Sequence, residues 1–137
     1  MSHLVIFYSY SGSTKGIAED YAKKEAADVY EIRDTKRPGK FKAYTAGVIA
    51  SIRGKAWTIV TPDIDLASFD RITLFAPVWA GNPPPAFNAM LELLPSDKNI
   101  SIKLVSASGK SECREKLDIF MKNKGSTLES FEDIKRG

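Results

Sequence analysis

Four serine and threonine hydroxyls, a tyrosine and a glycine lie in one short loop near the start of the chain. Ser9-Tyr10-Ser11-Gly12-Ser13-Thr14 follows an apolar run and precedes a helical pattern. A helix N-terminus carries unpaired N–H groups and a partial positive charge, which attract an anion. Gly12 would let the backbone approach that anion, and the hydroxyls would add donors. The loop therefore predicts a phosphate site without a lysine clamp; a serine-capped helix start is the simpler interpretation.

A second loop, Ala76 to Pro85, places Trp79 among glycine and proline residues. Tryptophan at such a loop either packs as a core or lid residue or offers a flat apolar face to a planar ligand. Together with a phosphate loop, the second interpretation indicates a phosphorylated aromatic ligand. Flavin mononucleotide (FMN) fits that description.

Other phosphate-binding and catalytic patterns are missing from the sequence. Neither GxxxxGK[ST] nor GxGxxG occurs, which argues against a nucleoside triphosphatase and a standard dinucleotide site. The single histidine, His3, would lie at the opposite end of the first strand from the loop, too far to serve as a base there. The single cysteine, Cys113, excludes an internal disulfide, and its apolar helical phase indicates a buried structural thiol. No metal site is indicated.

Strands and helices alternate along the chain and would position these loops. Apolar runs predict strands, and apolar stripes with helical spacing predict helices. We expect strands over 4–8, 29–32, 72–76, 100–105 and 127–131, and helices over 17–26, 41–54, 87–94 and 113–121. This alternation predicts a parallel sheet with helices on both faces. Ligands of such sheets bind beyond the carboxyl ends of the strands, where the loops after strands one, three and four emerge.

Length and composition are those of an ordinary globular protein. The 137 residues fit a single domain, residues 1–137, and 43% of them are hydrophobic and 27% charged. The longest apolar run, Leu4 to Tyr8, is far shorter than the roughly 20 residues of a membrane span. No signal peptide is visible. We therefore expect a cytoplasmic protein with no membrane partner.

The net charge of +3 is unevenly distributed. Between Arg33 and Thr61 seven basic residues stand against one acidic residue. This segment is either a solvated helix face or a patch that attracts an acidic partner or a phosphorylated cofactor. No nucleic-acid recognition pattern accompanies it, so a nucleic-acid partner is not expected.

The two loops resemble those of the flavodoxin family, in particular its single-domain branch. Ser9, Ser11, Gly12 and Thr14 match the family's [ST]-x-[ST]-G-x-T motif, and the stretch from Phe69 to Gly81 with its following prolines resembles the second flavin loop. The similarity covers roughly residues 4 to 122. It implies a three-layer, doubly wound, flavodoxin-like α/β fold with a parallel five-stranded sheet in the order 2-1-3-4-5. The family's last helix would be absent after the fifth strand.

The resemblance also implies FMN held by three loops. The first loop would bind the phosphate, and Trp79 would stack on or edge the flavin ring. Backbone groups of Val78 to Asn82 would meet its N5 and O4 edge, where the family's redox-linked hydrogen-bond partner maps to the Ala80–Gly81 peptide. The third loop would approach the pyrimidine end. The implied cofactor-binding residues are Ser9, Tyr10, Ser11, Gly12, Ser13, Thr14, Pro77, Val78, Trp79, Ala80, Gly81, Asn82, Ser106, Ala107, Ser108 and Gly109. No side chain is expected to be catalytic, because the flavin does the chemistry.

Three functions remain open at this point. The leading hypothesis is an FMN-binding redox protein of flavodoxin type that exchanges electrons with a partner protein. The third loop, Ser106 to Glu112, has no aromatic residue to cover the flavin; this favours a small FMN oxidoreductase that uses NAD(P)H or quinones and a small planar substrate. A non-redox module that binds a phosphate ligand is the second alternative. An edge strand without a covering helix would also allow a homodimer.

Overall fold

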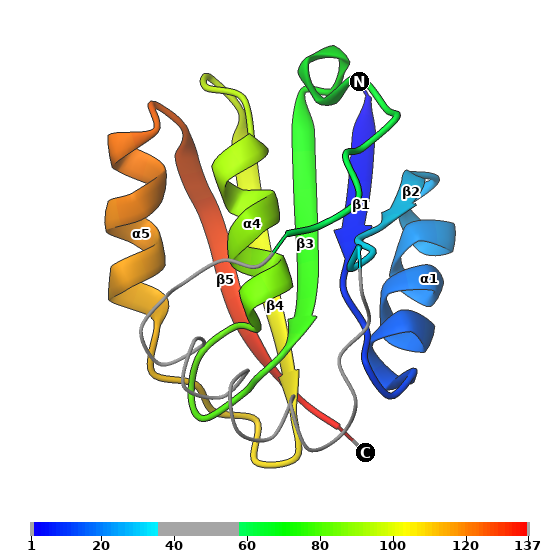
Figure 1. Ribbon diagram of the computed structural model, residues 1–137, viewed down its shortest axis with the longest axis vertical. Helices are drawn as coiled ribbons and strands as arrows, with labels where there is room; N and C mark the ends of the chain where they lie inside the picture. The colour runs from blue at the N-terminus through cyan, green and yellow to red at the C-terminus, as the bar shows by residue number, and fades with distance from the viewer. Residues whose placement is uncertain (1, 36–57, 137) are drawn as a thin grey trace.

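A five-stranded parallel sheet forms the centre of the computed structural model, which describes residues 2–35 and 58–136. The strands are β1 (His3–Phe7), β2 (Asp28–Glu31), β3 (Arg71–Pro77), β4 (Asn99–Ser106) and β5 (Thr127–Lys135). Their order is β2-β1-β3-β4-β5, and every neighbouring pair is parallel. The predicted fold and strand order are therefore confirmed (Figure 1).

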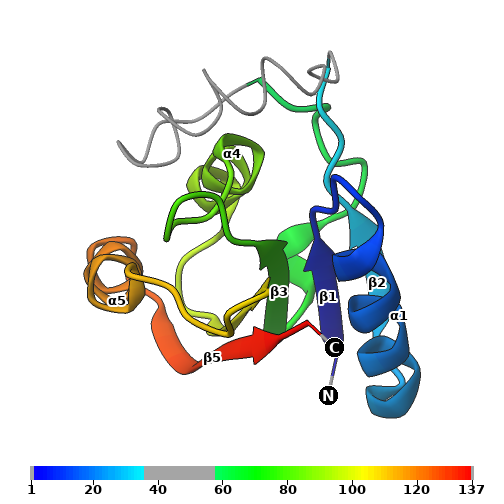
Figure 2. The ribbon, with the colours of Figure 1, turned by 90° about the horizontal axis from the view of Figure 1, so that it is seen from below.

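The helices cover both faces of this sheet. Helix α1 (Ser13–Glu25) lies on one face, and α4 (Pro85–Leu93) and α5 (Arg114–Asn123) lie on the other (Figure 2). A short 3-10 helix, η2 (Leu66–Ser68), precedes β3. The helix expected over 41–54 and most of the basic segment lie outside the described residues. Within the described ranges, no helix is long and apolar enough to cross a membrane.

The core on the α4–α5 face is the larger of the two. It is built from alternate strand residues such as Leu4, Leu74 and Ile102, together with Phe87 and Met90 of α4. The α1 face has a smaller cluster, made of Val5, Phe7, Ala18, Ala22, Phe75 and Val105. All residues from Leu4 to Tyr8 are buried, as the continuous apolar run predicted for a strand covered on both sides.

The fifth strand is longer than the sequence predicted. It was expected to end at residue 131 but continues to Lys135. Its last four residues, Glu132-Asp133-Ile134-Lys135, include a single apolar side chain, so an apolar pattern does not reveal this part of the strand. Its backbone pairs with β4 as far as Lys135, opposite Ser106. Two side chains add to this pairing: Lys103 Nζ of β4 donates to Glu132 Oε1 at 2.7 Å, and Ile134 packs against the α1-side core.

The half of the α1 face over β4 and β5 is polar. Beyond β5 the described chain continues only to Arg136, so no further helix covers this part of the sheet among the described residues. Besides the Lys103–Glu132 pair, Arg71 Nη2 lies 3.0 Å from Glu129 Oε1. These ion pairs stand where a packed helix would require apolar contacts. A homodimer formed through this part of the sheet stays a prediction.

Candidate functional site

Three loops meet at the carboxyl edge of the sheet. They follow β1, β3 and β4 and lie at the bottom of Figure 1 and nearest the viewer in Figure 2. The Tyr10 ring of the first loop contacts the Trp79 ring of the second, with centroids 5.9 Å apart. The Glu112 N–H of the third loop donates to the Gly81 carbonyl of the second at 2.8 Å. The structure therefore brings together all three segments in which site residues were expected.

The first loop enters α1 without a side-chain cap. Gly12 is the N-cap residue, with φ +103°, and no side chain bonds to the helix N-terminus. Instead, Ser9 Oγ accepts the Gly12 N–H at 3.0 Å. The simpler interpretation, a serine-capped helix start, is therefore wrong. The exposed N–H groups of the first turn keep their capacity to donate to a ligand.

The space around this helix start suits an anion. A Cβ atom placed on Gly12 would meet no atom within 4 Å, so the backbone can be approached closely. Ser11 is exposed and no acidic residue occupies the first turn of α1. Thr14 is buried at the start of the helix. A negative group would meet the positive end of the helix dipole and donors, with no carboxylate in that turn to repel it.

The second loop contains a tight two-residue turn. The Trp79 N–H donates to the Asn82 carbonyl at 2.7 Å, and the Asn82 N–H donates to the Trp79 carbonyl at 3.1 Å. The two central residues, Ala80 and Gly81, have φ +51° and +83°. Positive φ at both positions is the signature of a type I′ turn. Alanine in this left-handed region costs roughly 1–2 kcal/mol, so the surroundings must hold Ala80 in place.

Contacts with the third loop and with α5 hold this turn. The Asn82 side chain is buried; its Nδ2 donates to the Ala80 carbonyl at 3.2 Å, and its Oδ1 accepts from Lys116 Nζ at 3.3 Å. A Cβ atom on Gly81 would lie only 2.9 Å from Glu112 Oε2. Sequence reasoning assigned no role to Lys116 or to Glu112, although Glu112 ends the predicted third loop.

Aromatic side chains stand behind the first two loops. Trp79 is half-buried, and the Tyr8 and Tyr10 rings meet it edge-on at 6.4 and 5.9 Å between centroids. The buried Tyr8 donates its hydroxyl to Asp34 Oδ2 at 2.7 Å. For a flat ring to fit between two aromatic rings, those two rings must be separated by roughly twice the carbon–carbon contact distance of ~3.5–4 Å. Tyr10 and Trp79 are too close for that, so a planar ligand would rest against an outer side of the pair.

The third loop uses its hydroxyls internally. Ser106 Oγ accepts the Gly109 N–H at 2.9 Å, and Ser108 Oγ accepts the Lys110 N–H at 3.2 Å. Ala107 and Ser108 are exposed, and no aromatic side chain projects from this loop. At its end Cys113 is buried, and this burial raises the pKa of the thiol above its usual range. The prediction of a buried thiol is confirmed.

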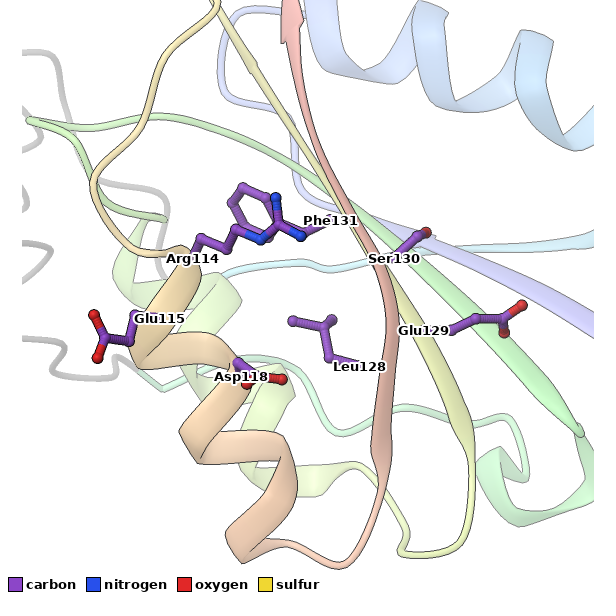
Figure 3. A pocket seen from close by; sticks show the side chains of 7 residues that line it. All are labelled: Arg114, Glu115, Asp118, Leu128, Glu129, Ser130 and Phe131. Carbon is purple, nitrogen blue, oxygen red and sulfur yellow. The ribbon is translucent and has the colours of Figure 1, made fainter.

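A separate hollow of about 370 Å³ lies between α5 and β5 (Figure 3). Its lining residues are Arg114, Glu115, Asp118, Leu128, Glu129, Ser130 and Phe131. Leu128 and Phe131 point into it, whereas Glu115, Glu129 and Ser130 point away from it. Arg114 covers the Phe131 ring at 5.8 Å. Because the polar groups do not converge, this hollow lacks the features of a ligand site.

Known structures share the arrangement of these elements. No protein-family model matches the sequence, and no curated protein sequence matches it. A flavoprotein of Lactobacillus acidophilus NCFM, solved in complex with FMN, superposes with a TM-score of 0.76 at 19% identity, over 95% of this chain and 91% of that one. Oxidised flavodoxin 1 of Bacillus cereus superposes with a TM-score of 0.57 at 17% identity, over 100% of this chain and 87% of that one. Two-electron reduced flavodoxin of Megasphaera elsdenii superposes with a TM-score of 0.61 at 16% identity, over 98% of this chain and 86% of that one.

These similarities agree with the strand order 2-1-3-4-5 and with helices on both faces of the sheet. The resemblance that the two sequence motifs indicated is thereby confirmed at the level of the fold. The chain has a flavodoxin-like fold.

Proposed function

We propose that this protein binds FMN between the three loops and exchanges electrons through the bound flavin. The observation that carries the proposal is the pairing of an uncapped helix start at Gly12 with an aromatic turn at Trp79, on one edge of the sheet. When bound, FMN supplies the redox chemistry, and the protein supplies binding, orientation and electrostatics. The Lactobacillus acidophilus neighbour, which was solved with FMN, supports this choice of ligand.

The first loop would hold the phosphate. Ser9, Ser11, Ser13 and Thr14 place hydroxyls around the open backbone of Gly12, and the helix N-terminus adds N–H donors. Hydrogen bonds to a charged group contribute about 1.5–3 kcal/mol each, more than bonds between neutral groups. These donors fit a dianion without an arginine or lysine contact.

The second and third loops would hold the ring. The N–H groups of the Trp79–Asn82 turn would face the N5 and O4 edge, and the Trp79 or Tyr10 ring would support one flat side. Pro77 and Val78 lead into this turn, and Val78 N–H is fixed by the Val105 carbonyl at 3.2 Å. Ser106 to Gly109 would border the pyrimidine end through backbone groups, because their hydroxyls bond within the loop.

The partner would be a redox protein that reaches the flavin at this edge. A cytoplasmic site of action and this partner are both predictions from the sequence. The residues named here bind and orient the flavin, and none of them is proposed as catalytic.

The phosphate assignment is tested with the double variant Ser11→Ala/Thr14→Ala. The variant is expected to weaken FMN binding by roughly tenfold to a hundredfold, because it removes charge-assisted donors, and to leave riboflavin binding nearly unchanged, since riboflavin lacks the phosphate. A matched control, Thr127→Ala/Ser130→Ala, removes the same hydroxyl types from exposed positions of β5. Equal losses for both ligands would refute the assignment.

A small FMN oxidoreductase is the second candidate, favoured by one observation. The third loop exposes Ala107 and Ser108 and carries no aromatic residue to cover the ring. An uncovered flavin face would admit a quinone or a nicotinamide. Two assays separate an enzyme from an electron carrier: steady-state oxidation of NADH and NADPH with a quinone acceptor, and reduction of the protein by a flavodoxin reductase. Turnover with the nicotinamide and the quinone indicates an enzyme. Electron exchange with the reductase alone indicates a carrier.

A further inference from the structure

We propose that the redox partner of this protein docks at the carboxyl edge of the sheet through an acidic surface, because cationic side chains surround the three loops. The inference rests on the proposed function, which places electron transfer at this edge, and it adds the charge of the partner. Five exposed side chains form what we call the basic rim: Lys15, Lys110, Lys116, Lys135 and Arg136.

The third loop carries most of the basic rim. Lys110 lies in the loop itself, and the end of β5 adds two more cations. The Arg136 N–H donates to the Ser106 carbonyl at 2.7 Å, and a Cβ atom on Gly109 would lie 3.0 Å from the Lys135 Cβ. Three positive charges therefore stand beside the loop that has no aromatic residue to cover a flavin.

The other two cations border the remaining loops. Lys15 is exposed on the first turn of α1, next to the first loop, and Lys116 Nζ of α5 lies 3.3 Å from Asn82 Oδ1 of the second loop. Because α1 and α5 lie on opposite faces of the sheet, these cations stand on both sides of the edge (Figure 2). The basic rim thus surrounds the site, whereas the polar groups of a small-ligand site converge on one place.

The carboxylates at this edge only partly offset the basic rim. Glu112 is the acidic residue of the three loops, and no member of the basic rim forms an ion pair within the described residues. Further charged residues at this edge are Glu31, Arg33, Asp34, Arg114, Glu115 and Asp133. In total, seven basic and five acidic side chains give the edge a net charge of +2. The described residues as a whole hold 14 basic and 17 acidic side chains, a net charge of −3.

A concentration of one charge around a site acts on the approach of a partner. Such fields raise association rates by roughly tenfold to a thousandfold for a partner of opposite charge, and they weaken with salt, since the Debye length is about 10 Å at 0.1 M. An acidic surface would therefore be drawn to this edge and a basic one repelled. The FMN phosphate, held at the first loop, would offset Lys15 but leave the three cations at the third loop.

The first test reverses two charges of the basic rim with Lys110→Glu/Lys135→Glu. The matched control, Lys23→Glu/Lys24→Glu, makes the same change at exposed positions in the last turn of α1, at the opposite end of the sheet. The FMN-loaded protein is reduced chemically without oxygen and mixed with an acidic acceptor, cytochrome b5, or a basic one, cytochrome c. Each reduced flavin passes its two electrons to two haem irons, one to each, which converts both from Fe(III) to Fe(II).

Wild-type electron transfer to cytochrome b5 should slow roughly tenfold as salt rises from about 20 to about 500 mM, and transfer to cytochrome c should accelerate. At low salt, Lys110→Glu/Lys135→Glu should slow transfer to cytochrome b5 roughly tenfold, while the control stays within about twofold of the wild type. A wild-type rate with cytochrome b5 that is independent of salt, or an equal loss in the control, would overturn the inference. A variant that raises only the KM for NADPH would also overturn it, since the basic rim would then serve a phosphorylated nucleotide.

The second test needs no flavin. A carbodiimide forms an amide bond between a lysine and a carboxylate in contact with it, and the reaction is run on the apoprotein with cytochrome b5. Peptide mapping should find the cross-links on the lysines of the basic rim; cross-links spread equally to Lys23 and Lys24 would overturn the inference. Failure of the wild-type protein to bind FMN would refute the proposed function, whereas the cross-links would still show whether the basic rim binds an acidic surface.

Discussion

The loop after β1 and the turn after β3 both place a glycine at positive φ, yet their surroundings are opposite. Gly12 stands in open space, at a helix start without a side-chain cap. Gly81 lies against the Glu112 side chain, in a turn where the carbonyls of Trp79, Ala80 and Gly81 all accept hydrogen bonds. The first loop is thus able to adapt to a ligand, whereas the second is fixed before a ligand arrives.

This difference matches what each region would bind. A phosphate is a compact anion whose oxygens accept bonds from many directions, so a loop with free donors can adjust to it. A flavin ring edge presents few atoms in fixed positions, so a fixed turn would suit one orientation of that edge. Gly12 leaves space for a ligand beside the backbone, while the methyl group of Ala80 restricts the backbone conformations of the second turn.

Gly81→Ala should have the largest effect on the apoprotein. The left-handed backbone costs alanine roughly 1–2 kcal/mol, and the new methyl group, 2.9 Å from Glu112 Oε2, also forces that side chain to move. Urea denaturation should therefore show a loss within this range, slightly raised by the displacement of the exposed Glu112 side chain. Adding Glu112→Ala should recover the part of the loss that comes from crowding. No recovery in the double variant would show that Glu112 does not confine the turn.

Gly12→Ala should cost less stability, because only the backbone conformation opposes it. No atom lies within 4 Å of the new methyl group, so the expected loss is about 1 kcal/mol. FMN binding should nevertheless weaken more than riboflavin binding, since the methyl group would stand where the phosphate approaches. A stability loss equal to that of Gly81→Ala would contradict the contrast between an open and a crowded loop.

Trp79 should report ligand binding at the fixed turn. FMN binding is expected to quench tryptophan fluorescence, and Trp79→Phe should remove most of that quenching while Trp57 remains as a reference. Affinity should fall modestly, because an aromatic contact adds about 0.5–1.5 kcal/mol beyond burial and phenylalanine keeps part of it. Undiminished quenching in the variant would place the flavin near Trp57 instead.

The smallest expected effect is the pH dependence of folding stability that His3, at the opposite end of β1, contributes. Burial, followed by the charge of Arg71, lowers the pKa of His3 below its ordinary value of 6.5, and His3 Nε2 lies 2.7 Å from Thr73 Oγ1. The folded state therefore binds fewer protons than the unfolded state. Stability is full above pH 6.5 and falls as the pH drops through the lowered value. His3→Gln should flatten this dependence in urea titrations; an unchanged slope would refute it.

Local sequence patterns predicted the alternating strands and helices and the three loops, whereas the order of the strands in the sheet came from the resemblance to the flavodoxin family. Continuous apolar residues indicated β1, and clustered hydroxyls indicated the loop that ends at Thr14. The far end of β5 was not predicted because three of its last four residues are charged, and Glu132 meets its partner, Lys103 of β4, only in the folded chain. The Lys116–Asn82 and Glu112–Gly81 contacts were not predicted for the same reason, because they join residues about thirty positions apart that meet only in the folded chain.

The left-handed Ala80 could not be anticipated either. Two-residue turns of this type favour Asn-Gly or Asp-Gly, and Ala-Gly is a weak signal for them. Only the contacts around the turn hold alanine in that conformation. The sequence therefore predicted which loops meet at this edge of the sheet, while the conformation of the second turn could be seen only in the assembled loops.

The central claim, that the open loop binds a phosphate while the fixed turn binds a ring, is tested most directly by comparing FMN with riboflavin on the wild-type apoprotein. Isothermal titration of each ligand gives two dissociation constants whose ratio isolates the phosphate. The account predicts that FMN binds at least tenfold more tightly, equivalent to about 1.4 kcal/mol, and that riboflavin still binds measurably through the turn. Equal affinities, or no binding of either flavin, would contradict it.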